Sequence, residues 1–109
     1  MVVRLRSTSV SFVVTHLLGN MEPDPEQDWI GPLISELNQA DQEHPDVAVT
    51  HESGWSLSGL ATGLVIFENV ESDDAPLSSE LTRQQLAEAF AALAAGDVVS
   101  VVALLEPRS

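Results

Sequence analysis

The chain carries no Lys or Arg between Ser7 and Thr82, although the same stretch holds fourteen Asp and Glu residues. A chain with so much uncompensated charge stays disordered unless its apolar residues are numerous enough to bury a core. The net charge over all 109 residues is −13, yet the hydrophobic fraction of 44% is ordinary for a globular protein. We therefore expect one folded acidic domain that spans residues 1–109.

The absence of cysteine excludes disulfides, thiolate metal sites and cysteine nucleophiles, and it suits a reducing compartment. The apolar run in the first twenty residues is interrupted by Ser, Thr and His, and no signal-peptide cleavage pattern follows it. No segment has the roughly eighteen apolar residues that a membrane-spanning helix needs. The sequence thus predicts a cytoplasmic protein that does not bind membranes.

Alternating apolar and polar residues predict several strands. Turn residues separate the middle ones, since Ser53-Gly54 is a hairpin signal and Gly63 closes a second turn. The last apolar run, which ends before Pro107, is also interpreted as a strand. The expected strands are Val10 to about Leu18, one that begins at Val47, Trp55 to Leu60, Leu64 to Phe67, and Val98 to Leu105.

Two segments have helical periodicity. The first begins at Trp29 with Asp28 as its N-cap, ends before Pro45, and presents Glu36 on an acidic outer face. The second begins after Thr82, which forms a capping box with the Gln three residues later, and it ends at Gly96.

The expected order of elements is therefore β-α-β-β-β-α-β. This order predicts an α+β fold with one mixed, mostly antiparallel sheet of about five strands and two helices on one face.

Motifs that carry chemistry are missing from the sequence. The histidines have no metal-binding spacing, no nucleophile elbow occurs, and the glycines do not form a phosphate-binding loop. A site built from His16, His51 and Glu52 across the sheet is an alternative that the sequence leaves open. We expect a protein that is not an enzyme and that has no cofactor and no dedicated metal site.

The acidic surface indicates the class of partner. It repels nucleic acid, whose phosphates need Lys or Arg, and it attracts basic proteins. The acids are densest in two loops, and a Trp next to the first loop is a candidate apolar anchor for a protein partner. The predicted partner-binding residues are Glu22, Asp24, Glu26, Asp28, Trp29, Glu71, Asp73 and Asp74.

Three segments of the second half, Gly54 to Leu57, Gly63 to Val70 and Leu93 to Val98, resemble small acidic bacterial immunity proteins of polymorphic toxin systems. The resemblance implies a protein that blocks a toxin by covering the toxin's active site. The toxin expected from the charge is a basic one, such as a nuclease. No role of an individual residue carries over, because these families differ in where they contact the toxin.

Two other functions fit the same sequence. A phage-type inhibitor that mimics DNA has the same acidic surface but targets a host defence complex. The other alternative is a homo-oligomeric structural or small-ligand-binding domain, such as a homodimer, in which the apolar runs Leu64 to Phe67 or Val98 to Leu105 pair between subunits.

Overall fold

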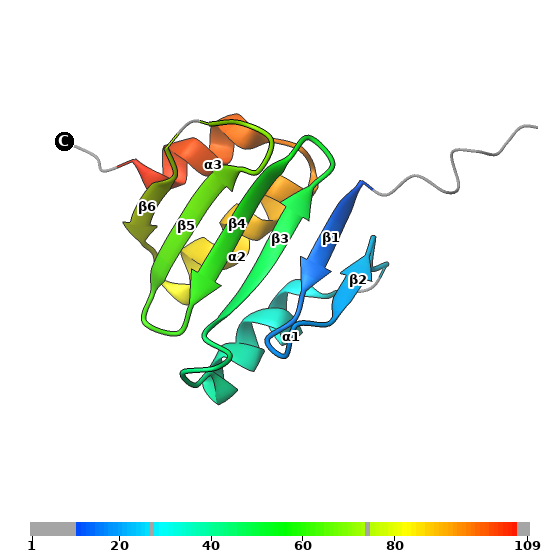
Figure 1. Cartoon of the computed structure of the whole chain (residues 1–109), viewed down its shortest axis with the longest axis vertical. Helices are drawn as coiled ribbons and strands as arrows, with labels where there is room; N and C mark the ends of the chain where they lie inside the picture. Colours follow the sequence, from blue (N-terminus) through cyan, green and yellow to red (C-terminus); the bar gives the residue numbers. More distant parts are fainter. Residues whose placement is uncertain (1–10, 27, 74, 107–109) are drawn as a thin grey trace, which may run out of the picture.

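The described part of the chain forms one antiparallel sheet of six strands, in the order β2-β1-β3-β4-β5-β6 (Figure 1). The computed structural model describes residues 11–26, 28–73 and 75–106. The strands are β1 Phe12–Thr15, β2 Met21–Pro23, β3 Asp46–His51, β4 Trp55–Leu60, β5 Leu64–Asn69 and β6 Leu77–Glu80.

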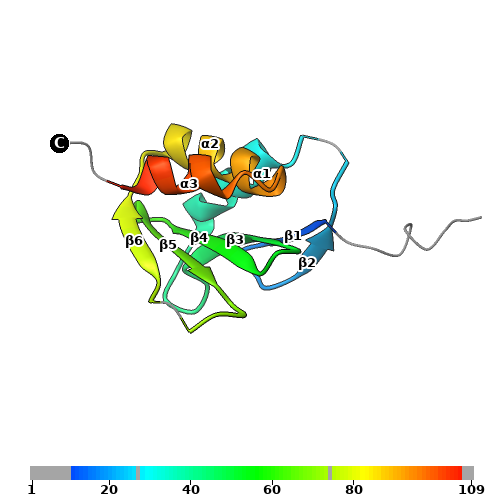
Figure 2. The ribbon, with the colours of Figure 1, turned by 90° about the horizontal axis from the view of Figure 1, so that it is seen from above.

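The α-helices pack on one face of this sheet (Figure 2). Helix α1 (Ile30–Ser35) continues into the 3-10 helix η2 (Glu36–Gln39), and both lie in the segment between β2 and β3. Helices α2 (Arg83–Ala94) and α3 (Val98–Leu105) follow β6. Among the described residues, no helix is long and apolar enough to cross a bilayer.

The core lies between the sheet and the helices. Val14, Val49, Leu57 and Phe67 sit opposite one another on four adjacent strands, and each is fully buried. Phe90 of α2 is also fully buried in the same apolar cluster. Burial of such side chains contributes about 2 kcal/mol each to folding, so the core stabilises the fold without ion pairs.

The three central strands confirm the expected meander. β3, β4 and β5 pair with their sequence neighbours, and the glycines of the two connecting turns have the left-handed backbone that such turns require. Gly54 has φ +97° and Gly63 has φ +99°.

The start and the end of α2 are also as expected. The Thr82 hydroxyl accepts the Gln85 N–H at 3.0 Å, and the Gln85 side chain accepts the Thr82 N–H at 2.9 Å. This is the predicted capping box. Gly96 follows the helix with φ +81°.

The last apolar segment is a helix, so the expectation of a final strand was wrong. The Asp97 side chain accepts the Ser100 N–H at 3.1 Å and the Ser100 hydroxyl at 2.7 Å, which caps the first turn of α3. Val101 and Leu105, four residues apart, are buried against the core. The helical spacing of these contacts outweighs the preference of valine for strands.

Four further expectations about the fold need correction. Within the described residues the sheet has six strands rather than about five, because β2 lies in the first of the two predicted acidic loops and β6 begins in the second. Every strand pair is antiparallel within the described residues, so the sheet is not mixed. The N-cap of α1 is Trp29, without a side-chain cap, and not Asp28. The observed order is β-β-α-β-β-β-β-α-α, with three helices instead of two.

Candidate functional site

Five of the predicted binding residues line one hollow between β2 and the start of α1. Its volume is about 560 Å³, and we call it the acidic hollow. Four carboxylates come from a stretch of seven residues, and no Lys or Arg is among the described residues of its wall. The lining residues are His16, Glu22, Pro23, Asp24, Pro25, Glu26, Asp28, Trp29 and Pro32.

The side chain of Asp24 connects the loop after β2 to the beginning of β1. Its carboxylate accepts the N–H groups of Ser11 and Phe12 at 3.1 and 3.2 Å, and its own N–H donates to the Phe12 carbonyl at 3.0 Å. Asp24 has φ +41°, a left-handed conformation that Asp adopts more readily than most residues. The role of Asp24 is therefore to shape the loop.

The carboxylates of Glu26 and Asp28 are the ones available to a partner. Both residues are exposed, and neither makes a hydrogen bond or ion pair with another part of the described chain. Glu22, by contrast, is bound to His16 at 3.0 Å. Within the predicted set of acids, Glu26 and Asp28 thus differ from Glu22 and Asp24, which are already engaged.

Trp29 forms a rigid part of the wall. Its ring is half-buried and packs at centroid distances of 5.3 Å from Phe12 and 6.5 Å from Phe90. The prolines at 23, 25 and 32 restrict the backbone around it. Trp55 packs instead on Phe67 at 4.6 Å, where it belongs to the periphery of the core.

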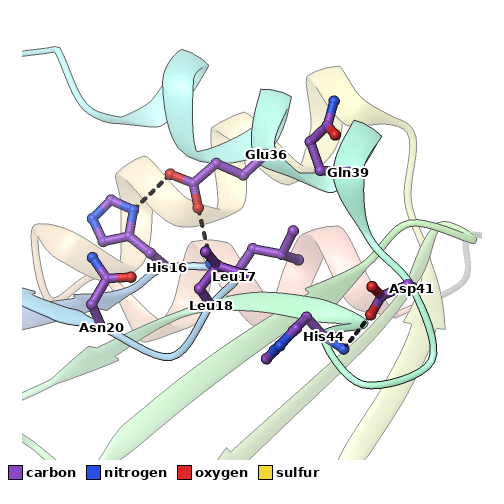
Figure 3. Close-up of a pocket in the computed structure, with 8 residues that line it drawn as sticks. All are labelled: His16, Leu17, Leu18, Asn20, Glu36, Gln39, Asp41 and His44. Atoms are coloured by element: carbon purple, nitrogen blue, oxygen red, sulfur yellow. Dashed lines mark hydrogen bonds and ion pairs between the residues drawn. The ribbon is translucent and has the colours of Figure 1, made fainter.

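His16 lines both the acidic hollow and a second hollow of about 440 Å³, which Figure 3 shows. Its Nδ1 lies 2.7 Å from Glu36 of η2, and its Nε2 lies 3.0 Å from Glu22 of β2. The second oxygen of Glu36 accepts the Leu17 N–H at 2.9 Å. Burial lowers the pKa of His16, but the hydrogen bonds and charges of Glu36 and Glu22 outweigh it, so the pKa is raised above the ordinary 6.5.

The expected outward position of Glu36 was therefore wrong, since it points toward His16 and Leu17. Twenty residues separate the partners His16 and Glu36 in the chain. No short-range pattern in the sequence indicates their contact. The second hollow is lined by His16, Leu17, Leu18, Asn20, Glu36, Gln39, Asp41 and His44.

The alternative site of His16, His51 and Glu52 is not formed. His51 lies opposite Phe12 in the ladder, four residues from His16 along β1, so the two histidines are about 13 Å apart. The His51 Nδ1 accepts the Ser53 N–H at 3.1 Å and lies 2.9 Å from the Ser53 hydroxyl, contacts that close the β3–β4 turn. No group of three potential metal ligands occurs in the described ranges.

The two acidic loops do not meet. Asp24 follows β2 and Glu71 follows β5, at the same end of the sheet but four strand spacings apart, which is about 19 Å. Glu52, in the β3–β4 turn, lies between them and donates its N–H to the Ser11 carbonyl at 2.7 Å. Asp73 is exposed in the second loop, and Asp74 lies outside the described residues.

Cations are scarce around these acids. Both ion pairs of the described chain involve His16. Arg83, the one arginine in the described ranges, donates to the Ile34 carbonyl at 3.3 Å. Comparison with family models, with curated proteins and with solved structures finds no match to this chain.

Proposed function

We propose that this protein is an inhibitor of the immunity-protein type, which binds and blocks a basic protein partner through the acidic hollow. The proposal rests on the wall of the hollow, which contains four carboxylates and one histidine but, within the described residues, no Lys or Arg. Such a surface accelerates the association of a basic partner and repels nucleic acid.

The chemistry of the hollow favours a Lys or Arg side chain of the partner as its occupant. Trp29 and the surrounding prolines offer apolar surface to the alkyl part of such a side chain. Glu26 and Asp28 lie next to this surface with their carboxylates unengaged in the described chain. A cation over a Trp ring adds about 0.5–1 kcal/mol at an exposed site.

A basic surface on the partner is typical of a protein that binds phosphates. A nuclease-type toxin has a basic active-site cleft, and an acidic protein that fills this cleft prevents access of the substrate. The rigid attachment of the loop through Asp24 supports this function, because a surface that is ordered before binding loses less entropy on association.

The test compares two variants that remove the same charge from different places. E26Q/D28N removes two charges from the acidic hollow, and E71Q/D73N removes two from the other loop. Partners are captured from native cell extract at about 50 mM and about 500 mM NaCl, because salt screens interactions between exposed charges. We expect the wild type and E71Q/D73N to retain one basic protein at low salt. E26Q/D28N should retain less of it, because this variant associates with the partner about tenfold more slowly.

Equal weakening by both variants would show that total charge, rather than the acidic hollow, governs binding. Retention of no basic protein, or retention that is indifferent to salt, would contradict the proposed function. A DNA-mimic inhibitor has the same charge logic, and identification of the captured protein as a nucleic-acid-binding host complex would favour it.

A second candidate function is a homodimer, which the opposite edge of the sheet favours. β6 is an edge strand that pairs with β5 alone among the described strands, and Leu77 on it is 40% exposed. Val99 on the adjacent helix α3 is 80% exposed. Edge pairing with a second copy would cover these groups. Light scattering over a range of concentrations tests it, and a strict monomer would contradict it.

A further inference from the structure

His16 connects three elements through its two ring nitrogens. The residue follows β1, Glu36 belongs to η2 and Glu22 to β2, and the ring lies between the two carboxylates at 2.7 and 3.0 Å. The hairpin of β1 and β2 is otherwise short, because β2 pairs with β1 over only three residues. The His16 contacts therefore add to the buried Val14 and Leu17 side chains in holding this edge against the helices.

Only the protonated ring satisfies this geometry. A carboxylate accepts hydrogen bonds, and a neutral imidazole has a single N–H to donate. If the ring loses its proton, one of its nitrogens presents a lone pair to a carboxylate oxygen about 3 Å away, and that contact becomes repulsive. The arrangement thus favours the charged ring, in agreement with the raised pKa of His16.

We propose that His16 is a proton-controlled latch that holds Glu22 in place when protonated and releases it into the acidic hollow when neutral. The inference rests on the proposed function, since it assigns a regulation to the same site. Loss of the proton changes the formal charge of the lining residues from −3 to −4 and frees a third carboxylate for a basic partner. Binding of that partner is then stronger at higher pH, and by linkage it promotes release of the proton.

The bond to Glu22 is the one that breaks. Glu36 is also held by the Leu17 N–H, which does not titrate, and its side chain is 32% exposed. Glu22 has no hydrogen-bond partner other than His16 in the described chain, and its side chain is 51% exposed. Water therefore replaces the His16 contact more readily at Glu22 than at Glu36.

The other titratable groups around His16 come from the loops that line the two hollows. Asp24, Glu26 and Asp28 lie on the side of the acidic hollow, and Asp41 and His44 line the second hollow. The charges that favour the protonated ring are those of Glu36 and Glu22. His44 is the other histidine that lines the second hollow, so each measurement is repeated in an H44Q background.

The first experiment follows the His16 ring nitrogens and the backbone amides by NMR between pH 5 and pH 9. We expect His16 to titrate above 6.5 and the amides of Met21 and Glu22 to shift with the same midpoint. The E22Q and E36Q variants should each lower that midpoint. A midpoint at or below 6.5 in the wild type, or hairpin amides that do not follow it, would overturn the latch.

The second experiment measures binding of an N-acetylated hexa-arginine peptide by calorimetry over pH 6–9, a range in which arginine does not titrate. The wild type should bind about threefold more tightly above the His16 midpoint than below it. H16N should lack this change, and E22Q should show a smaller one, because only the charge of His16 then changes with pH. The same pH profile in all three proteins would overturn the inference.

The two proposals fail in different ways. Absence of peptide binding by the wild type at every pH would contradict the acidic hollow as a cation-binding site, while the NMR titration would still report the latch. Binding that depends on Glu26 and Asp28 but not on the protonation state of His16 would retain the proposed function and remove the regulation.

Discussion

At the scale of single residues, three polar side chains accept hydrogen bonds from backbone N–H groups at the ends of elements. Thr82 caps α2, Asp97 caps α3, and Asp24 holds the N–H groups at the start of β1. Each satisfies donors that otherwise have no partner within their own element. Hydrogen bonds from the Ser100 hydroxyl and N–H lower the pKa of Asp97 as a result.

Removal of the Thr82 cap should destabilise the protein. In Thr82→Ala the hydroxyl that accepts the Gln85 N–H is lost, which costs about 1 kcal/mol of the free energy of unfolding. Urea unfolding followed by circular dichroism measures the change. Thr82→Ser keeps the hydroxyl and should lie close to the wild type, so an equal loss in both variants would show that the methyl group matters instead.

The stability of the fold should depend on pH through His16. The folded pKa of His16 is raised above 6.5, so the stabilisation is fully present below 6.5 and is lost as the pH rises through the folded value. We expect the free energy of unfolding to fall between pH 6 and pH 9 in the wild type and to fall less in H16N. Urea unfolding at pH 6 and at pH 9 measures the free energy of unfolding. An equal decrease in the wild type and in H16N would refute the effect.

The acids and Trp29 of the candidate site were predictable from the sequence, and the contacts that hold Asp24, His16 and Glu36 were not. Glu22, Asp24, Glu26 and Asp28 are close in sequence, so their density alone placed them on one surface. The sequence does not reveal that Asp24 is engaged by the β1 backbone, nor that Glu36 reaches His16 from a different element. Such contacts depend on the order of strands, which local patterns do not determine.

At the scale of elements, the sequence predicts an element well where its local signals agree. The meander from β3 to β5 has alternation together with turn glycines, and α2 has a capping box together with a terminal glycine. For α3 the signals conflict, since six of its eight residues are valine or leucine in a run without polar alternation. The decisive signal was Asp97, a helix N-cap directly after Gly96.

Alanine substitutions along α3 should follow helical spacing. Val101→Ala removes a fully buried side chain and should cost about 2 kcal/mol of the free energy of unfolding. Val99→Ala changes a residue that is 80% exposed and should stay within about 0.5 kcal/mol of the wild type. In a strand these two residues would share a face, so comparable losses in thermal or urea unfolding would speak against the helix.

At the scale of the whole molecule, the acids are bound by few cations. The described chain has two ion pairs, both through His16, against a net charge of −13. Mutual repulsion of the carboxylates therefore opposes compaction, and the apolar core must outweigh it. The same excess of negative charge attracts a basic partner. It therefore lowers the stability of the fold and strengthens binding.

Salt should consequently stabilise this protein. Raising NaCl from about 10 mM to about 300 mM shortens the screening length from roughly 30 Å to below 10 Å and weakens repulsion between carboxylates. We expect the urea midpoint of the wild type to rise. E26Q/D28N, with two charges fewer, should begin at a higher midpoint and rise less, whereas a midpoint that falls with salt would mean that attraction to the few cations outweighs repulsion among the acids.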